Sequence, residues 1–268
     1  MEKWVNMLKF KASWGELGNQ NTSSLYPFFE TMPLTIGKGK WLLDGALTNT
    51  AGIPALVSTL LTWERVRSFN IGLDFGMFSN RLTGSIEYFK RKTLDMVGPA
   101  PQLPAVLGIA VPKTNNADMQ SVGFDFDIQW RDRIGKVDYG IKFNLSDAQA
   151  KVLRYPNTTD AIGDWYAGKL SGTYWGYVTK GIAKTDEEMQ EHLASLPNGG
   201  QNKIGSKWGA GDIMYVDVNG DGQISPGQNT LSDHGDKTII GNSTPRFNYG
   251  IILDAAYAGF DFQCFFKV

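Results

Sequence analysis

The residues best suited to chemistry lie between Asp217 and Ile224, where the chain reads Asp-Val-Asn-Gly-Asp-Gly-Gln-Ile. Oxygen ligands at the first, third and fifth positions, glycine at the sixth and an aliphatic residue at the eighth match the first two-thirds of a calcium-binding loop. The closing position holds Gln228 instead of a bidentate glutamate, so Asp233 or Asp236 would have to close the site. We expect a structural Ca²⁺ site with these ligands: Asp217, Asn219, Asp221, Gln223, Asp233 and Asp236.

The alternative for this loop is a turn-rich segment that holds itself by bonds from its Asp and Asn side chains to the backbone. The rest of the chain carries no catalytic pattern. The two histidines, His192 and His234, form no HExxH motif, no Ser-His-Asp cue is present, and the glycine-rich stretches lack the context of a phosphate-binding loop. Cys264 lies in an apolar run, as a packing residue does. We therefore expect no enzyme and name no catalytic residue.

The segment around this loop is predicted to contain one short helix. Thr185 with Glu188 three residues later forms a capping box, which predicts a helix of about 10 residues with Met189 and Leu193 packing inward and His192 in solvent. The aromatic run 174–177 is either a surface contact patch or a local core under a long loop.

The elements that carry this segment are amphipathic strands, seen most clearly in the hairpin 66–92. Apolar residues occupy every second position from Phe69 to Met77. After a turn at Ser79-Asn80 the pattern resumes with Leu82, Gly84, Ile86 and Tyr88. Each arm runs about 10 residues, the length that a tilted strand needs to cross a membrane. An amphipathic hairpin of a soluble sandwich alternates in the same way.

Composition narrows the choice of class. No stretch of 18 apolar residues is present, which excludes a transmembrane helix, and the net charge of −1 gives no basis for nucleic-acid binding. The start of the chain shows no signal peptide, so an exported protein would be numbered in its mature form or as a fragment.

Alternation predicts seven strands, whose connections are in turn long and short. The long ones are 15–65, 93–119 and 149–244, and the short ones are near 79–80, 132–136 and 257–259. Short turns at one rim and long loops at the other are typical of outer-membrane barrels. Aromatic residues of the apolar face gather at the short-turn rim, as expected at a membrane interface: Phe78, Trp130, Tyr257 and Phe260.

The opposite face of each predicted strand carries charges that would be costly in hydrocarbon, so we expect it to line a wet or protein-filled lumen. These charged residues are Asp74, Glu87, Asp125, Asp127, Asp138, Lys142, Asp254 and Asp261. The fold expected is an all-β, antiparallel, up-and-down transmembrane barrel segment with long extracellular loops and one short helix.

Several segments, in this order and spacing, resemble the SusC/RagA family of TonB-linked (TonB-dependent) outer-membrane proteins. They are Leu8 to Gly15 with Gly18-Asn19-Gln20, Trp63-Glu64 with Asn70 to Gly76, Asn80 to Gly84, Tyr174 to Tyr177 with the predicted helix, Gly211-Asp212-Ile213 with Asp217 to Gly222, Ile239 to Asn242, and Thr244 to Phe247. The resemblance implies an outer-membrane importer of glycans or peptides in a Gram-negative bacterium. A TonB complex would energise it, and a SusD-like lipoprotein would cover its extracellular mouth.

Residues 1–268 are expected to be a partial barrel domain from the C-terminal region of such a protein. We see no TonB box and no plug domain, and the chain stops within a strand; seven strands cannot close a barrel of about 22. The alternative, from another class, is a soluble calcium-dependent carbohydrate-binding β-protein. The side chains that distinguish the two readings, outward to lipid in a barrel and interdigitated in a sandwich, are Phe69, Leu73, Phe124, Ile141 and Ile251.

Overall fold

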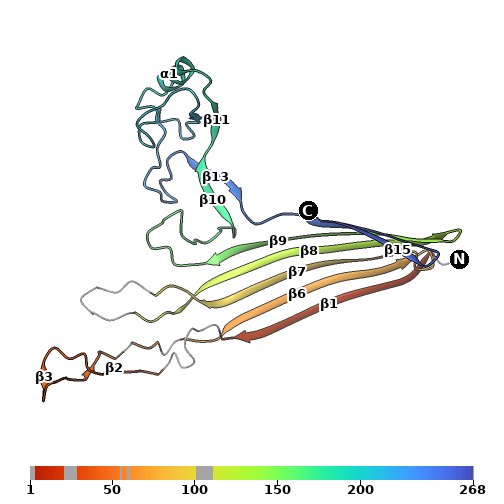
Figure 1. Ribbon diagram of the computed structural model, residues 1–268, viewed down its shortest axis with the longest axis horizontal. Helices are drawn as coiled ribbons and strands as arrows, with labels where there is room; N and C mark the ends of the chain where they lie inside the picture. The colour runs from red at the N-terminus through yellow and green to blue at the C-terminus, as the bar shows by residue number, and fades with distance from the viewer. Residues whose placement is uncertain (1–3, 21–28, 55, 59–60, 101–110, 268) are drawn as a thin grey trace.

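The computed structural model describes residues 4–20, 29–54, 56–58, 61–100 and 111–267. Seven long strands form one antiparallel sheet, and each strand is hydrogen-bonded to its neighbours in the sheet (Figure 1). In order across the sheet they are β1 (Val5–Asn19), β6 (Glu64–Met77), β7 (Leu82–Val97), β8 (Asn115–Ile134), β9 (Val137–Arg154), β14 (Asn248–Tyr257) and β15 (Phe260–Lys267). The predicted up-and-down arrangement is confirmed, and the sheet stays open in this chain.

All short turns lie at one end of the sheet and all long connections at the other (Figure 1). The turns are at 78–81, 135–136 and 258–259, close to the predicted positions. In the first of them Phe78, Ser79 and Asn80 all have positive φ, between 54° and 66°. Parts of the first two long connections, at 21–28, 55, 59–60 and 101–110, lie outside the described residues.

At five of the six strand ends the strands extend further toward the long-loop rim than predicted, and only β14 begins later, at Asn248. The connections are therefore 20–63, 98–114 and 155–247. The predicted limits of 15–65, 93–119 and 149–244 were wrong at these ends because the apolar alternation stops before the strand does. Residues Gly15 to Asn19, for example, are polar or glycine apart from Leu17, yet each pairs with a residue between Glu64 and Ser68. Backbone pairing does not require apolar side chains.

The long connections contain small elements of their own. The first holds two short ribbons, β2 (Leu34–Thr35) with β5 (Thr50–Ala51) and β3 (Leu42–Leu43) with β4 (Ala46–Leu47). The third holds β10 (Thr173–Tyr177) paired with β13 (Lys237–Asn242), β11 (Thr179–Ile182) paired with β12 (Ile213–Tyr215), and helix α1 (Asp186–Ala194). Within the described ranges, no helix is long and apolar enough to span a membrane.

Helix α1 begins as predicted, with the Thr185 side chain accepting a hydrogen bond from the Glu188 backbone N–H at 3.2 Å. Met189 is fully buried and Leu193 packs beside it, in a small core with Ala183, Met214 and Trp208. The expectation that His192 is solvated was wrong, since it is buried with Nε2 3.2 Å from Gln201 Oε1. Position 192 follows Met189 by three residues and therefore lies on the same helix face.

The strand register sorts the side chains of the large sheet onto two faces. We call the face that carries Phe69, Ile86 and Ile141 the outer face, and the face that carries Asp74 and Glu87 the inner face. The five side chains that distinguish barrel from sandwich all lie on the outer face, and none is buried. No second sheet covers either face within the described residues (Figure 1), so the two-sheet alternative was wrong.

The apolar region of the outer face forms an oblique band across the strands. The last apolar residue of this face toward the long-loop rim is Trp14 on β1, whereas on β9 it is Leu145, which is followed on that face by Asp147. One row of paired residues runs from Leu145 to Phe10, and Trp14 lies four residues beyond Phe10. That offset is about 14 Å along a strand, over four interstrand steps of about 19 Å in total. The ratio gives a strand tilt of about 35° from the normal to the band, the inclination found in membrane barrels.

Aromatic rings gather at the short-turn rim as predicted. Phe78 lies between Trp4 and Trp130, with ring centroids 5.6 and 6.1 Å away. Tyr257 and Phe260 flank the last turn and are exposed. The band therefore ends in aromatic residues on this side, as expected at a membrane interface.

Candidate functional site

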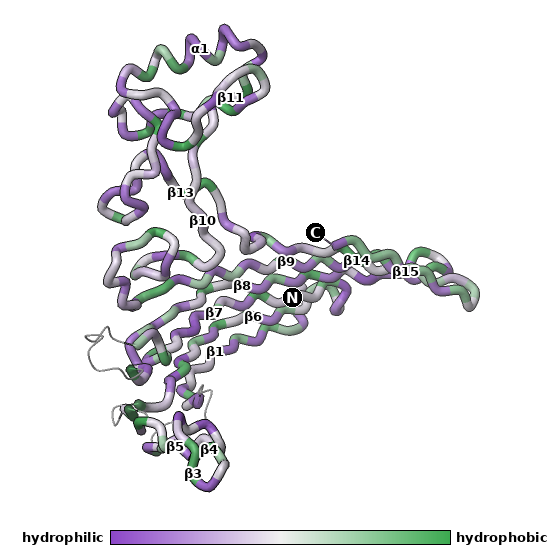
Figure 2. Tube along the Cα trace, turned by 60° about the vertical axis from the view of Figure 1, so that its left-hand side comes forward, coloured by the Kyte–Doolittle hydropathy of each residue, from purple (hydrophilic) through white to green (hydrophobic). Residues whose placement is uncertain are grey.

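The inner face carries a network of charged and polar side chains across the first four strands of the sheet. Lys11 Nζ lies 2.7 Å from Asp74 Oδ1 and 3.9 Å from Glu87 Oε2. Between β7 and β8, Ser85 Oγ donates to Asp127 Oδ2 at 2.7 Å. The register thus brings the predicted polar lining together on one face. Hydrophilic and hydrophobic residues alternate along these strands (Figure 2).

A second charged cluster runs along the long-loop rim and ties five strands together. Arg65 pairs with Asp95 at 2.7 Å, and Arg154 pairs with Asp118 at 2.8 Å and with Asp95 at 3.1 Å. Glu16 accepts from Arg67 on the neighbouring strand. Because the three arginines are about half-exposed, each ion pair alone adds little to the free energy of unfolding, and together the pairs hold the strand ends of the rim in place.

Glu64 is the buried acid of this rim, with an exposed fraction of 3%. One of its carboxylate oxygens accepts from Asn19 Nδ2 at 3.0 Å and the other from the Val97 backbone N–H at 3.2 Å. It therefore joins the ends of β1, β6 and β7 where the first two long connections leave the sheet.

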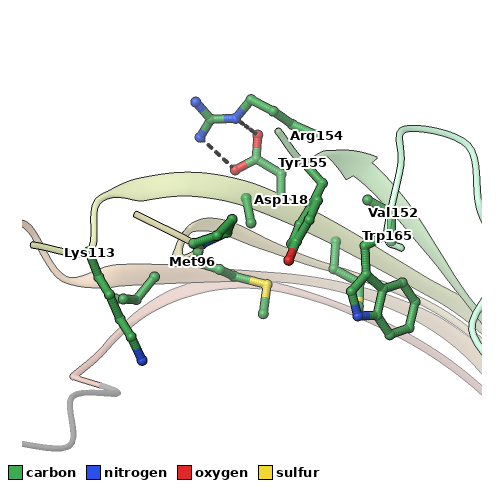
Figure 3. Close-up of a pocket in the computed structure, with 12 residues that line it drawn as sticks. Met96, Lys113, Asp118, Val152, Arg154, Tyr155 and Trp165 are labelled. Carbon is green, nitrogen blue, oxygen red and sulfur yellow. Dashed lines mark hydrogen bonds and ion pairs between the residues drawn. The ribbon is translucent and has the colours of Figure 1, made fainter. Parts of the chain in front are cut away.

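A cavity of about 350 Å³ opens beside this rim (Figure 3). Its floor is formed by apolar side chains at the ends of β7, β8 and β9, among them the buried Ala117 and Val152. Tyr155 and Trp165, from the third long connection, and the Arg154–Asp118 pair complete the wall. An apolar floor with an aromatic ring and a fixed ion pair is suited to holding a small organic group.

Several aromatic residues of the long connections have ring faces that could stack on sugar rings, and their surroundings differ. Trp165 lines the cavity, whereas Trp41 is exposed on the β3–β4 side of the first connection. Trp175 and Tyr177 pack locally, against His234 and Tyr215 at centroid distances of 5.2 and 5.4 Å. The run 174–177 thus contributes mainly to a local core, although Tyr174 is half-exposed.

The loop at Asp217 is closed by its own hydrogen bonds. Asp217 accepts from the backbone of Gly220 and Gly222, at 2.6 and 2.7 Å. The fully buried Asp236 accepts from Val218 at 2.9 Å and Ser225 at 2.7 Å. The carboxylates of Asp217 and Asp236 thus accept backbone hydrogen bonds from the loop itself, as expected for the self-bonded turn that is the alternative to a calcium site.

Two other predicted ligands, Asn219 and Asp221, also accept hydrogen bonds from the loop backbone. Asn219 Oδ1 accepts from the Asp221 backbone N–H, and Asp221 accepts from Gln223, each at 3.0 Å. The Asp233 carbonyl accepts from Gln228 at 3.1 Å. Among the residues that the structure describes, no group of three or more His, Cys, Asp or Glu side chains is arranged to hold a metal ion. Calcium binding by these residues stays a prediction.

Two cations fasten the third long connection. Lys169 is buried and donates to three backbone carbonyls, those of Ile162, Gly163 and Asp164, at 2.7 to 3.1 Å. Burial lowers the pKa of Lys169, and the nearby Asp164 opposes that shift. Arg246 forms two hydrogen bonds of 2.6 Å to Asp147 on β9, and this contact raises the pKa of Arg246.

Sequence reasoning missed the rim cluster, Glu64 and the cavity. The sequence did contain a signal for the cluster, because Arg65 and Arg67 occupy every second position before Phe69 and therefore lie on the same face of β6. For the cavity no local signal exists, since its wall joins residues that lie up to 69 positions apart, from Met96 to Trp165.

Comparison with known proteins agrees with this geometry. The family described as TonB dependent receptor-like, beta-barrel matches residues 3–261. TonB-dependent receptor P3 of Formosa agariphila is 26% identical over 277 residues, which cover 98% of this chain and 25% of that protein. TonB-dependent receptor SusC of Bacteroides thetaiotaomicron is 23% identical over 269 residues, covering 96% of this chain and 24% of SusC. The chain thus spans about a quarter of the length of these relatives.

Solved structures show the same fold. The structure of the RagAB peptide transporter matches all of this chain and 27% of its own, with a TM-score of 0.65 at 19% sequence identity. The RagAB peptide importer in its open-open state matches with a TM-score of 0.63.

Proposed function

Because the chain belongs to the TonB dependent receptor-like β-barrel family, we propose that it forms part of the wall and extracellular mouth of a nutrient importer. The chain is part of an outer-membrane protein of a Gram-negative bacterium. The observation that carries the proposal is the sheet itself, with an unburied apolar face, a charged opposite face and every long connection at one rim.

The substrate that we propose is an oligosaccharide or a peptide, which the full-length protein would import across the outer membrane as a SusC-like transporter. The cavity at the long-loop rim is the candidate contact, because Trp165 and Tyr155 offer ring faces beside its apolar floor. A TonB complex would supply the energy, and a SusD-like lipoprotein would close over the long connections.

Uptake by the full-length protein in its own outer membrane tests this function. Cells that lack the gene should fail to grow on one oligosaccharide or peptide as sole source and should recover with the intact gene. Trp165→Ala should reduce uptake of that substrate, whereas Trp41→Ala, a matched change outside the cavity, should not. Normal uptake of every oligosaccharide and peptide in the absence of the gene would contradict the proposal.

The partner is tested separately by affinity purification of the full-length protein from outer membranes. A SusD-like lipoprotein should copurify in a fixed ratio, and its removal should reduce uptake without removing the barrel protein from the membrane. Purification of the barrel protein alone, together with uptake that is independent of any lipoprotein, would contradict this part of the proposal.

A further inference from the structure

The outer face changes from apolar to basic just above the band on β6 and β7. On β6 the apolar series ends at Phe69 and is followed on the same face by Arg67. On β7 the series ends at Tyr88 and is followed by Lys90 and Lys92. We call Arg67, Lys90 and Lys92 the basic patch.

The register places the three residues of the basic patch together. Arg67 lies directly opposite Lys92, and Lys90 lies opposite Phe69, one place closer to the band. The pairing of β6 with β7 contains no register shift, so all three residues lie on the outer face. Directly opposite like charges destabilise a sheet unless an anion offsets them.

The protein supplies too little negative charge to offset the patch. Arg67 is paired with Glu16, but neither Lys90 nor Lys92 forms an ion pair with any described residue. On the other side, the residues opposite Lys90 and Lys92 are Val122 and Gln120. The nearest acid of that strand by register on this face, Asp118, already accepts two hydrogen bonds from Arg154, at 2.8 and 3.0 Å.

The height of the basic patch matches the headgroup layer of the membrane. Two and four residues beyond Tyr88 correspond, at the tilt derived above, to about 6 and 11 Å above the end of the band. The polar layer on each side of a bilayer is about 5 to 8 Å thick, and a lysine can extend its ammonium group toward it. The long connections identify this as the extracellular side, where the outer leaflet of a Gram-negative membrane carries phosphorylated glycolipid.

We propose that Arg67, Lys90 and Lys92 form a binding site on the lipid-facing wall for the phosphate groups of a glycolipid of the outer leaflet. Guanidinium and ammonium groups are the usual partners of phosphate. The acyl chains of the same lipid lie against the apolar residues below, such as Tyr88 and Ile86. The site is independent of the imported substrate, because it lies on the opposite face of the sheet from the lumen.

Native mass spectrometry of the purified full-length protein, titrated with a bis-phosphorylated lipid A and with the same lipid after removal of its phosphates, tests the site. A basic residue beside an anionic lipid surface changes affinity about fivefold. The double variant Lys90→Gln/Lys92→Gln should therefore bind the phosphorylated lipid roughly 25-fold more weakly, and Lys90→Arg/Lys92→Arg should bind it normally. The dephosphorylated lipid should bind weakly and equally to all forms.

Arg91→Gln is the matched control, because Arg91 lies between the two lysines but on the inner face, opposite Ser68 and Ser121. It removes one positive charge and should leave binding unchanged. If the double variant does not assemble, Lys92→Gln alone should show a loss of about fivefold. Unchanged binding by the glutamine variants, an equal loss in Arg91→Gln, or equal binding of the dephosphorylated lipid to the unaltered protein would overturn the proposal.

Discussion

An arginine in the middle of the band should be far more harmful than an arginine a few residues away on the other face. Ile86 is the test position, since it is 45% exposed on the outer face and lies opposite Leu73 and Phe126. Thr83, on the inner face of the same strand and opposite Gly76, is the matched control.

The expected magnitude follows from depth. An arginine on the lipid face near the bilayer midplane costs about 2–4 kcal/mol. With a tenfold change in an equilibrium constant for every 1.4 kcal/mol, Ile86→Arg should lower the ratio of folded to unfolded protein by a factor of roughly 30 to 1,000. Thr83→Arg faces the hydrated lumen and should lower it by less than about tenfold.

The assay is urea unfolding of the full-length protein in phospholipid vesicles, followed by its shifted migration on unheated gels. Ile86→Arg should unfold at a clearly lower urea concentration than Thr83→Arg. Equal destabilisation by both changes, or a larger effect of Thr83→Arg, would refute the assignment of the two faces.

Three further predictions concern the rim and the third long connection. Glu64→Ala should leave the Val97 N–H without its acceptor, cost about 1–3 kcal/mol and speed amide exchange at the end of β7; unchanged exchange would contradict this. Met189→Ala should destabilise the small core by about 2–5 kcal/mol, seen as faster proteolysis of the connection while outer-membrane assembly is unchanged. Because burial lowers the pKa of Lys169, the folded connection should become more stable as pH rises toward the ordinary lysine pKa, and Lys169→Met should abolish that rise in protease protection.

The calcium prediction is tested by the same protease assay. Added Ca²⁺ should protect the loop at Asp217 in the unaltered full-length protein and should lose that effect in Asp217→Asn. Identical cleavage with Ca²⁺ and with a chelator would leave the loop as a self-bonded turn, which the hydrogen bonds of Asp217 to Gly220 and Gly222 already provide.

The large sheet was predictable because its signal is local. Phe69 to Met77 and Leu82 to Tyr88 alternate without interruption, and a strand needs only this period to reveal which face is apolar. The positions of the strand ends could not be predicted. Beyond Trp14 and Leu145 the outer face becomes polar, and the period of the sequence no longer distinguishes a paired strand from a loop.

The candidate site was less predictable because it is assembled from distant segments. Glu64 meets Asn19 and Val97 only after three strands are aligned, and no spacing within the sequence records that alignment. The capping box at Thr185 was found because both of its residues lie within one helical turn. Burial of His192 could have been predicted from its spacing from Met189, but its partner Gln201 lies outside the helix.

The most direct test of the account is the environment of consecutive residues along 82–88 in β7. A nitroxide label is placed at each position in turn in the full-length protein, with Cys264 replaced by serine, and its access to oxygen in lipid and to a water-soluble nickel complex is measured in outer membranes. We expect a period of two, with positions 82, 84, 86 and 88 accessible to oxygen and positions 83, 85 and 87 to the nickel complex. Uniform access along the strand, or alternation of the opposite phase, would contradict the assignment of this sheet to the wall of an outer-membrane barrel.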